Sequence, residues 1–115
     1  MKQEIFEKLD QILANSEVVI DRAKGTTHPR YRDYVYPMDY GYLDGTQSQD
    51  GGGIDVWIGS GDRNNITGIL VIADAIKKDS EIRLLLGCSD QEAEVALEQS
   101  NIGDMAAMLI ERNTK

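Results

Sequence analysis

Hydrophobic and polar positions follow a helical period at the start of this chain. Residues 2–15 place large apolar side chains on one side and Glu4 and Lys8 on the other, which predicts an amphipathic helix of about three turns. The apolar positions are Ile5, Phe6, Leu9, Ile12 and Leu13. We expect this face to pack on the chain's own domain, and a helix that binds a partner is the alternative.

The middle of the chain has the pattern of β-strands. Residues 17–20 are rich in β-branched side chains, and residues 55–58 place Val56 and Ile58 on one face. Residues 66–73 form an apolar run that ends at Asp74. A turn leads to Asp79 and then to a strand over residues 82–86. The run over 66–73 is too short to cross a membrane, so a buried strand is expected. Trp57 is expected in the core or at an interface.

The tail is predicted to be helical. Ser89 and Glu92 form a capping box that begins a helix through about Gln99. Asn101 is predicted to cap a second helix, whose apolar face would carry Met105 and Met108. Because methionine packs adaptably, this face suits a second subunit as well as the domain itself, and we expect a homo-oligomer.

Composition narrows the class of protein. The net charge of −8 disfavours binding to nucleic acid or to an acidic membrane surface. Cys88 is the single cysteine, which excludes an internal disulfide. Neither a secretory leader nor an apolar run of about 18 residues is present. We therefore expect one soluble, cytoplasmic domain over residues 1–115.

Candidate chemistry gathers between residues 34 and 55, which hold four of the five tyrosines. Asp50 and Asp55 flank three glycines, so the backbone can bring two carboxylates together, as a hard cation such as Mg²⁺ requires. A glycine-rich hairpin turn with capping aspartates is the alternative. Tyr36, Tyr40 and Tyr42 alternate, which places their rings on one face of an extended segment. Pro37 and Gly41 predict that no regular strand runs through this stretch.

A second concentration of charge lies just before it. Arg22, Lys24, His28, Arg30 and Arg32 fall within eleven residues of an acidic chain. Such a patch indicates either a site for a small anion or ion pairs with surplus carboxylates on the surface. His28 lacks the companions of a zinc site, so a solvated or capping role is expected for it.

The ordered motifs Tyr36-Pro37, Tyr40-Gly41-Tyr42 and Asp50-Gly-Gly-Gly-Ile-Asp55-Val56 resemble the signature of the soluble, magnesium-dependent inorganic pyrophosphatases. The resemblance covers residues 17 to 87. It implies an α+β, mainly β fold, a small antiparallel OB-like barrel. This barrel would be flanked by the N-terminal helix and the short C-terminal helices.

The resemblance also implies a site. Its metal ligands would be Asp50, Asp55, Asp74 and Asp79, with Mg²⁺ or Mn²⁺ bound, and Asp50 and Asp55 would take part in catalysis. Pyrophosphate would be contacted by Tyr36, Tyr40 and Arg30, where Arg30 takes the place of a lysine of the family. Further positive charge would come from Lys24 and Arg22. Asp74 and Asp79 would lie together at one end of a hairpin. The alternative is that this end is an ordinary solvated turn without a function.

Several family positions differ here. Gly52 replaces the middle aspartate that activates water, and Glu81 replaces a lysine. A hairpin arginine and a terminal Tyr-Lys pair are missing. Asp39 is the first substitute for the lost carboxylate. The leading hypothesis is a metal-dependent phosphohydrolase. The alternative is a degenerate relative that binds metal or phosphate, and a nucleic-acid-binding barrel is disfavoured by the net charge.

Overall fold

The fold is a mixed sheet with a helix on each face. The computed structural model describes residues 1–48 and 51–113, and over these residues it contains two α-helices and six strands. The helices are α1 (Lys2–Ala14) and α2 (Asp90–Gln99). The strands are β1 (Glu17–Arg22), β2 (Asp39–Asp44), β3 (Ile54–Ile58), β4 (Ile66–Asp74), β5 (Asp79–Leu86) and β6 (Met105–Glu111).

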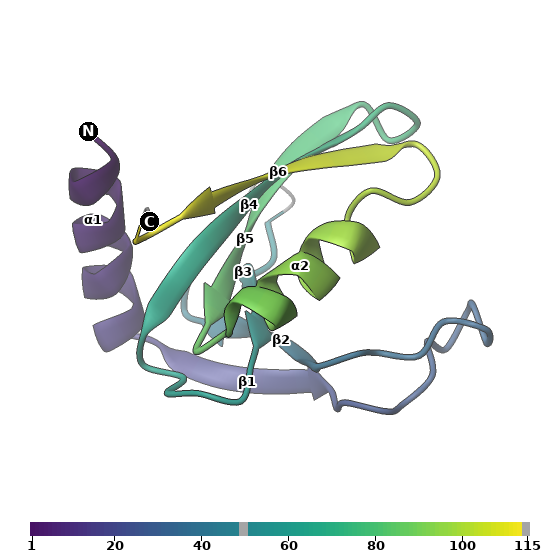
Figure 1. Cartoon of the computed structure of the whole chain (residues 1–115), viewed down its shortest axis with the longest axis horizontal. Coiled ribbons are helices and arrows are strands. Elements are labelled where there is room, and N and C mark those ends of the chain that lie inside the picture. Colours follow the sequence, from purple (N-terminus) through teal and green to yellow (C-terminus); the bar gives the residue numbers. More distant parts are fainter. Residues whose placement is uncertain (49–50, 114–115) are drawn as a thin grey trace.

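The strands are ordered β1-β2-β3-β5-β4-β6 in the sheet. Every pairing is antiparallel except that of β3 with β5, which run parallel. The sheet curves without closing, so that β1 and β6 form its two edges (Figure 1). The predicted mainly β fold class is confirmed, as a roughly barrel-like but open sheet.

Alternation along the strands builds a separate core on each side of the sheet. Val56 and Leu84 join Phe6 of α1 in one apolar cluster. Their neighbours Trp57 and Leu85 point the other way and join a second cluster with residues of α2. Trp57 is therefore a core residue, as predicted. No helix in the described part of the chain is long and apolar enough to span a membrane.

The predicted second helix in the tail is wrong. Residues 105–111 form β6, which pairs antiparallel with β4 along its length. Met105 and Met108 thus lie on opposite faces of a strand instead of on one face of a helix. The side chain of Asn101 binds the edge of this strand, because its Oδ1 accepts the backbone N–H of Ala107 at 3.0 Å. Tertiary pairing here overrides the local capping signal.

The YGY segment is more regular than predicted. β2 continues through Gly41, which pairs with Ile20 of β1 and Val56 of β3. Of the two residues predicted to interrupt a strand, only Pro37 lies outside β2. The prediction that Gly41 interrupts a strand is therefore wrong.

Glu92→Gln is expected to lower the free energy of unfolding at pH 7 by about 1 kcal/mol. The backbone N–H of Ser89 donates to the Glu92 carboxylate at 2.9 Å, and the backbone N–H of Ser60 donates to it at 3.1 Å. These bonds, the one from Ser89 most of all, hold the pKa of Glu92 below its usual value. A lowered pKa adds stability above the unfolded-state pKa, and this stability is lost as the pH falls through the folded-state pKa.

Urea unfolding followed by Trp57 fluorescence, at pH 7 and pH 3, measures the effect. The difference between Glu92→Gln and the wild type should shrink at the lower pH. Glu94→Gln, in an exposed position of the same helix, is the control and should change little at either pH. An equal loss at both pH values would contradict the role assigned to the Glu92 carboxylate.

Candidate functional site

Four polar side chains meet on the face of the sheet that α2 covers in part. The Tyr40 hydroxyl donates to Asp55 Oδ2 at 2.9 Å. Asp55 on β3 lies beside Arg83 on the parallel strand β5, and the Arg83 guanidinium carbon is 5.6 Å from the centre of the Tyr40 ring. Arg83 Nη2 donates to Glu81 Oε1 at 2.8 Å. We call Tyr40, Asp55, Glu81 and Arg83 the Tyr40 cluster.

The cluster keeps its donors protonated. Burial raises the pKa of Tyr40 well above its usual value, and Asp55 raises it further against the opposing effect of Arg83. Burial alone would lower the pKa of Arg83, but Tyr40, Glu81 and Asp55 outweigh it, so that its pKa is raised. The site therefore holds a neutral phenol and a permanent cation beside two carboxylates.

Arg83 has unused binding capacity. Its Nε is buried and has no hydrogen-bond partner among the described residues. A guanidinium has five N–H donors in a planar fork that suits phosphate oxygens. Arg83 lies outside the motifs identified in the sequence. The available signal was its spacing, since Glu81 and Arg83 must share a face of one strand.

The predicted hairpin with Asp74 and Asp79 is confirmed. The two residues are direct partners where β4 turns into β5. Asp74 Oδ1 accepts the backbone N–H groups of Ile76 and Lys77, each at 3.0 Å, so this carboxylate caps the turn.

The hairpin lies at some distance from Asp55. Asp79 precedes Arg83, the neighbour of Asp55, by four residues of strand, which is roughly 13 Å. Asp50 lies outside the described residues. Within residues 1–48 and 51–113, no three His, Cys, Asp or Glu side chains are grouped closely enough to hold a metal ion.

Asp39 lies on the opposite face of the sheet from Tyr40, because the two are consecutive residues of β2. Its Oδ1 accepts the backbone N–H of Lys24 at 2.7 Å. The structure thus separates Asp39 from Asp55. Arg22, in contrast, is the direct partner of Tyr40 across the β1–β2 pair and shares its face.

The β1–β2 loop, residues 23–38, forms a short irregular hairpin that the sequence analysis did not predict. Gly25 and Tyr36 are joined by a backbone hydrogen bond of 2.9 Å, and Thr27 pairs with Val35. The loop brings the Tyr36 ring to 6.0 Å from the Tyr40 ring, as the alternation of tyrosines predicted. Arg30 lies at the exposed tip of this loop.

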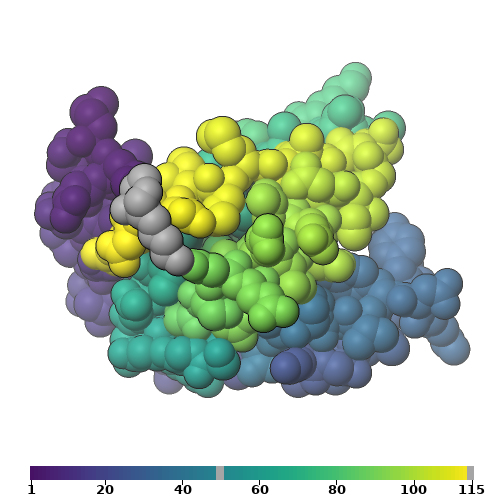
Figure 2. All heavy atoms as spheres, in the orientation of Figure 1, coloured from purple at the N-terminus to yellow at the C-terminus, as the bar shows by residue number. Residues whose placement is uncertain are grey.

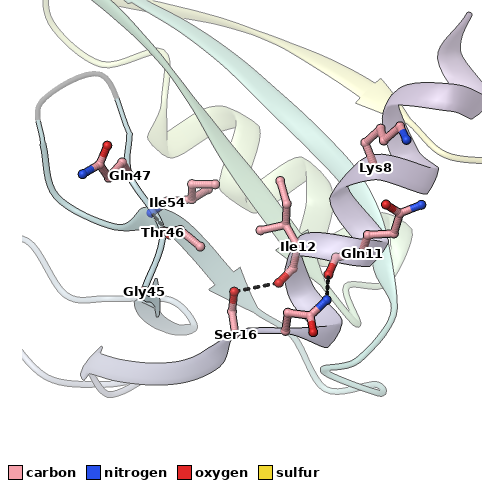
Figure 3. A pocket seen from close by; sticks show the side chains of 9 residues that line it. Lys8, Gln11, Ile12, Ser16, Gly45, Thr46, Gln47 and Ile54 are labelled. Atoms are coloured by element: carbon pink, nitrogen blue, oxygen red, sulfur yellow. Dashed lines mark hydrogen bonds between the residues drawn. The ribbon is translucent and has the colours of Figure 1, made fainter.

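A groove of about 530 Å³ lies elsewhere, between the end of α1 and the segment that follows β2 (Figure 3). Ile12, Ser16, Thr46 and Ile54 are among the residues that line it. Some of its polar groups are used locally, for example in the bond from Ser16 Oγ to the Ile12 carbonyl at 2.6 Å. It contains none of the predicted site residues.

Comparison with solved structures supports one part of the resemblance. An inorganic pyrophosphatase from Helicobacter pylori matches with a TM-score of 0.55 and 15% identity, over 84% of this chain and 82% of that chain. An inorganic phosphatase from Anaplasma phagocytophilum matches with a TM-score of 0.54 and 15% identity, over 82% and 81%. The chain has a pyrophosphatase-like fold. No family model and no curated protein sequence matches it.

The pyrophosphatase-like fold explains why the YP and YGY motifs lie together in space. Tyr36 precedes β2, Tyr40 lies within it, and Asp55 follows on the neighbouring strand β3. At 15% identity this likeness concerns the backbone arrangement, and the roles of individual side chains depend on their own contacts.

Proposed function

We propose that this protein is a divalent-metal-dependent phosphohydrolase that acts on pyrophosphate or a related phosphoanhydride. The observation that carries the proposal is the Tyr40 cluster, where a carboxylate, a phenol and an arginine whose Nε has no partner among the described residues converge on one face of a pyrophosphatase-like fold. Arg83 and Arg22 would attract the anion, and Tyr36 would border the site. Such a substrate suits an acidic protein only if local cations offset its charge.

The carboxylates of the cluster fit a magnesium or manganese site in which water and substrate fill the remaining coordination positions. Asp55 and Glu81 are carboxylates on one face, and Mg²⁺ is commonly held by one or two carboxylates together with water and substrate phosphates. Asp55 and, from the sequence, Asp50 would be its ligands. Asp79 and Asp74, roughly 13 Å away along β5, lie too far from Asp55 to bind the same ion. When bound, such an ion polarises the phosphoanhydride and lowers the pKa of water.

The reaction consumes one water molecule. The water oxygen forms a bond to one phosphorus, the bond from that phosphorus to the bridging oxygen breaks, and the bridging oxygen leaves with its electron pair on the second phosphate. One proton of the water must pass to a base. Gly52 provides no side chain for this task, and Asp39 faces the other side of the sheet. We therefore expect slow turnover.

Phosphate release from pyrophosphate tests the proposal. The purified protein should release phosphate with Mg²⁺ or Mn²⁺ and stop when a chelator is added. Gly52→Asp, which restores a carboxylate, is expected to raise the rate about 100-fold, the usual contribution of a general base. Gly52→Asn, which adds similar volume without a base, is the control and should stay near the wild-type rate. A wild type and a Gly52→Asp variant that are both silent would overturn the proposal.

One observation favours a second candidate function. The guanidinium of Arg83 places a positive charge within the cluster that does not depend on a metal ion. A protein that binds a phosphorylated anion without hydrolysing it would use this arrangement. It would bind pyrophosphate in the presence of a chelator, whereas the hydrolase would require the metal ion.

A further inference from the structure

The β1–β2 loop is a basic projection on an acidic protein. It extends away from the sheet beyond the ends of β1 and β2 (Figure 1), and Figure 2 shows the same blue segment standing out from the body of the molecule. The side chains of Lys24, Arg30 and Arg32 form no ion pair with any other part of the described chain. The basic patch had two explanations, an anion site or ion pairs with surplus carboxylates. These three side chains form no such ion pairs. Their charge is available to an anion.

Aromatic rings connect the tip of this loop to the Tyr40 cluster. The Tyr31 ring lies 5.0 Å from His28, His28 lies 6.2 Å from Tyr36, and Tyr36 lies 6.0 Å from Tyr40. The ring of Tyr36 is buried, but Tyr31 is 62% exposed. The rings therefore begin at an open platform and end beside the site proposed for hydrolysis.

The platform is held in place before any ligand binds. His28 Nδ1 accepts the backbone N–H groups of Arg30 at 3.0 Å and of Tyr31 at 3.2 Å. This capping role agrees with the one predicted for His28. Because the tip is closed by these bonds, less conformational freedom is lost when a ring stacks on Tyr31.

We propose that the anion bound by this protein is a nucleoside di- or triphosphate, whose base stacks on Tyr31 while its terminal phosphates reach the Tyr40 cluster. This inference rests on the proposed function and names its substrate class. Pyrophosphate has no apolar face, so an exposed aromatic platform would contribute nothing to its binding. A base offers a π face to Tyr31, and Arg30 and Arg32 lie on either side of that residue in the sequence.

The charge of the protein favours a nucleotide over a polymer. A nucleic acid would extend past the loop. Since the loop itself is basic, the rest of the protein is more acidic than its total of −8 and would repel further phosphates.

The reaction is the hydrolysis proposed for pyrophosphate, with a different leaving group. Water attacks the terminal phosphorus of a nucleoside diphosphate, and the bond from that phosphorus to the bridging oxygen breaks. The bridging oxygen leaves with its electron pair as part of the nucleoside monophosphate, and inorganic phosphate is the second product. One proton passes from the attacking water to a base, as for pyrophosphate.

The test compares three ligands that share a diphosphate group and differ in what is attached to it. They are pyrophosphate, methyl diphosphate and adenosine diphosphate, all with Mg²⁺. In the wild type, KM for adenosine diphosphate should be about tenfold lower than for methyl diphosphate, the usual worth of one stacked base. Tyr31→Ala should remove that difference and leave pyrophosphate unchanged. Tyr31→Phe, which keeps the ring, is the matched control and should behave as the wild type.

The outcomes separate this inference from the proposed function. Hydrolysis of pyrophosphate with equal KM for the two diphosphate esters would overturn the inference alone. If neither the wild type nor Gly52→Asp releases phosphate from any ligand, the proposed function fails, and calorimetric binding of adenosine diphosphate decides the inference. About tenfold weaker binding to Tyr31→Ala supports the inference, and equal or absent binding overturns it. Tighter binding of a single-stranded oligonucleotide than of the mononucleotide would overturn it in favour of nucleic acid.

Discussion

Asp55→Asn is expected to reduce metal-dependent phosphate release at least about 100-fold. A carboxylate that holds the metal ion is worth several kcal/mol of transition-state stabilisation, and each 1.36 kcal/mol is a factor of ten in rate. Asparagine keeps the volume and can still accept the Tyr40 hydroxyl, which now lies 2.9 Å from Asp55 Oδ2. The loss should therefore come from the missing charge.

Two controls separate charge from structure. Tyr40→Phe removes the hydrogen bond to Asp55 but leaves the carboxylate, so the rate should fall far less than in Asp55→Asn. Thermal unfolding of both variants, followed by circular dichroism, should show a folded sheet. An Asp55→Asn variant that keeps more than half of the wild-type rate would mean that this carboxylate does not hold the metal and that hydrolysis occurs elsewhere.

Gly41→Ala is expected to destabilise the protein by about 3 kcal/mol or more, a large part of the stability of a small domain. A Cβ at this position would lie 1.8 Å from the carbonyl oxygen of Val19 and 3.0 Å from the Cα of Ile20. Both atoms belong to the backbone of β1, which is paired with β2 at this point. Room can be made only if the β1–β2 pairing is disrupted.

Urea unfolding monitored by Trp57 fluorescence measures this loss. Gly45→Ala is the matched control, because a Cβ there would meet nothing within 4 Å. Gly45 has φ +83°, so alanine should cost only about 1 kcal/mol through the left-handed backbone. Equal losses in the two variants would show that the close approach of β1 is not what requires glycine in the YGY motif.

Much of the chain could be predicted because its signals are local. The period of apolar residues predicted α1, and the capping box at Ser89 predicted α2. The run after Ile66 and the turn before Asp79 predicted a hairpin with both aspartates at one end. Each signal lies within the segment that it describes, and in these segments the tertiary pairing agrees with it.

The predicted site was harder to assemble because its parts lie on different strands. The sequence named Tyr36, Tyr40 and Asp55, which do gather on one side of the sheet. It also named Asp39 and Arg30, which the structure places on the opposite face and at the loop tip. A strand's side chains alternate between faces, so a substitute carboxylate one residue from Tyr40 could not reach the same face.

What the sequence by itself determined is the order of helices and strands up to residue 99, apart from β2, and the motifs whose resemblance indicated a pyrophosphatase-like fold. Only the tertiary structure decided that residues 105–111 form a strand and that Arg83 lies in the Tyr40 cluster. Both outcomes depend on pairing between distant segments: β6 acquires its hydrogen bonds from β4, and Arg83 reaches Asp55 because β5 runs parallel to β3. Backbone groups must find partners, and which partner is near depends on the whole fold.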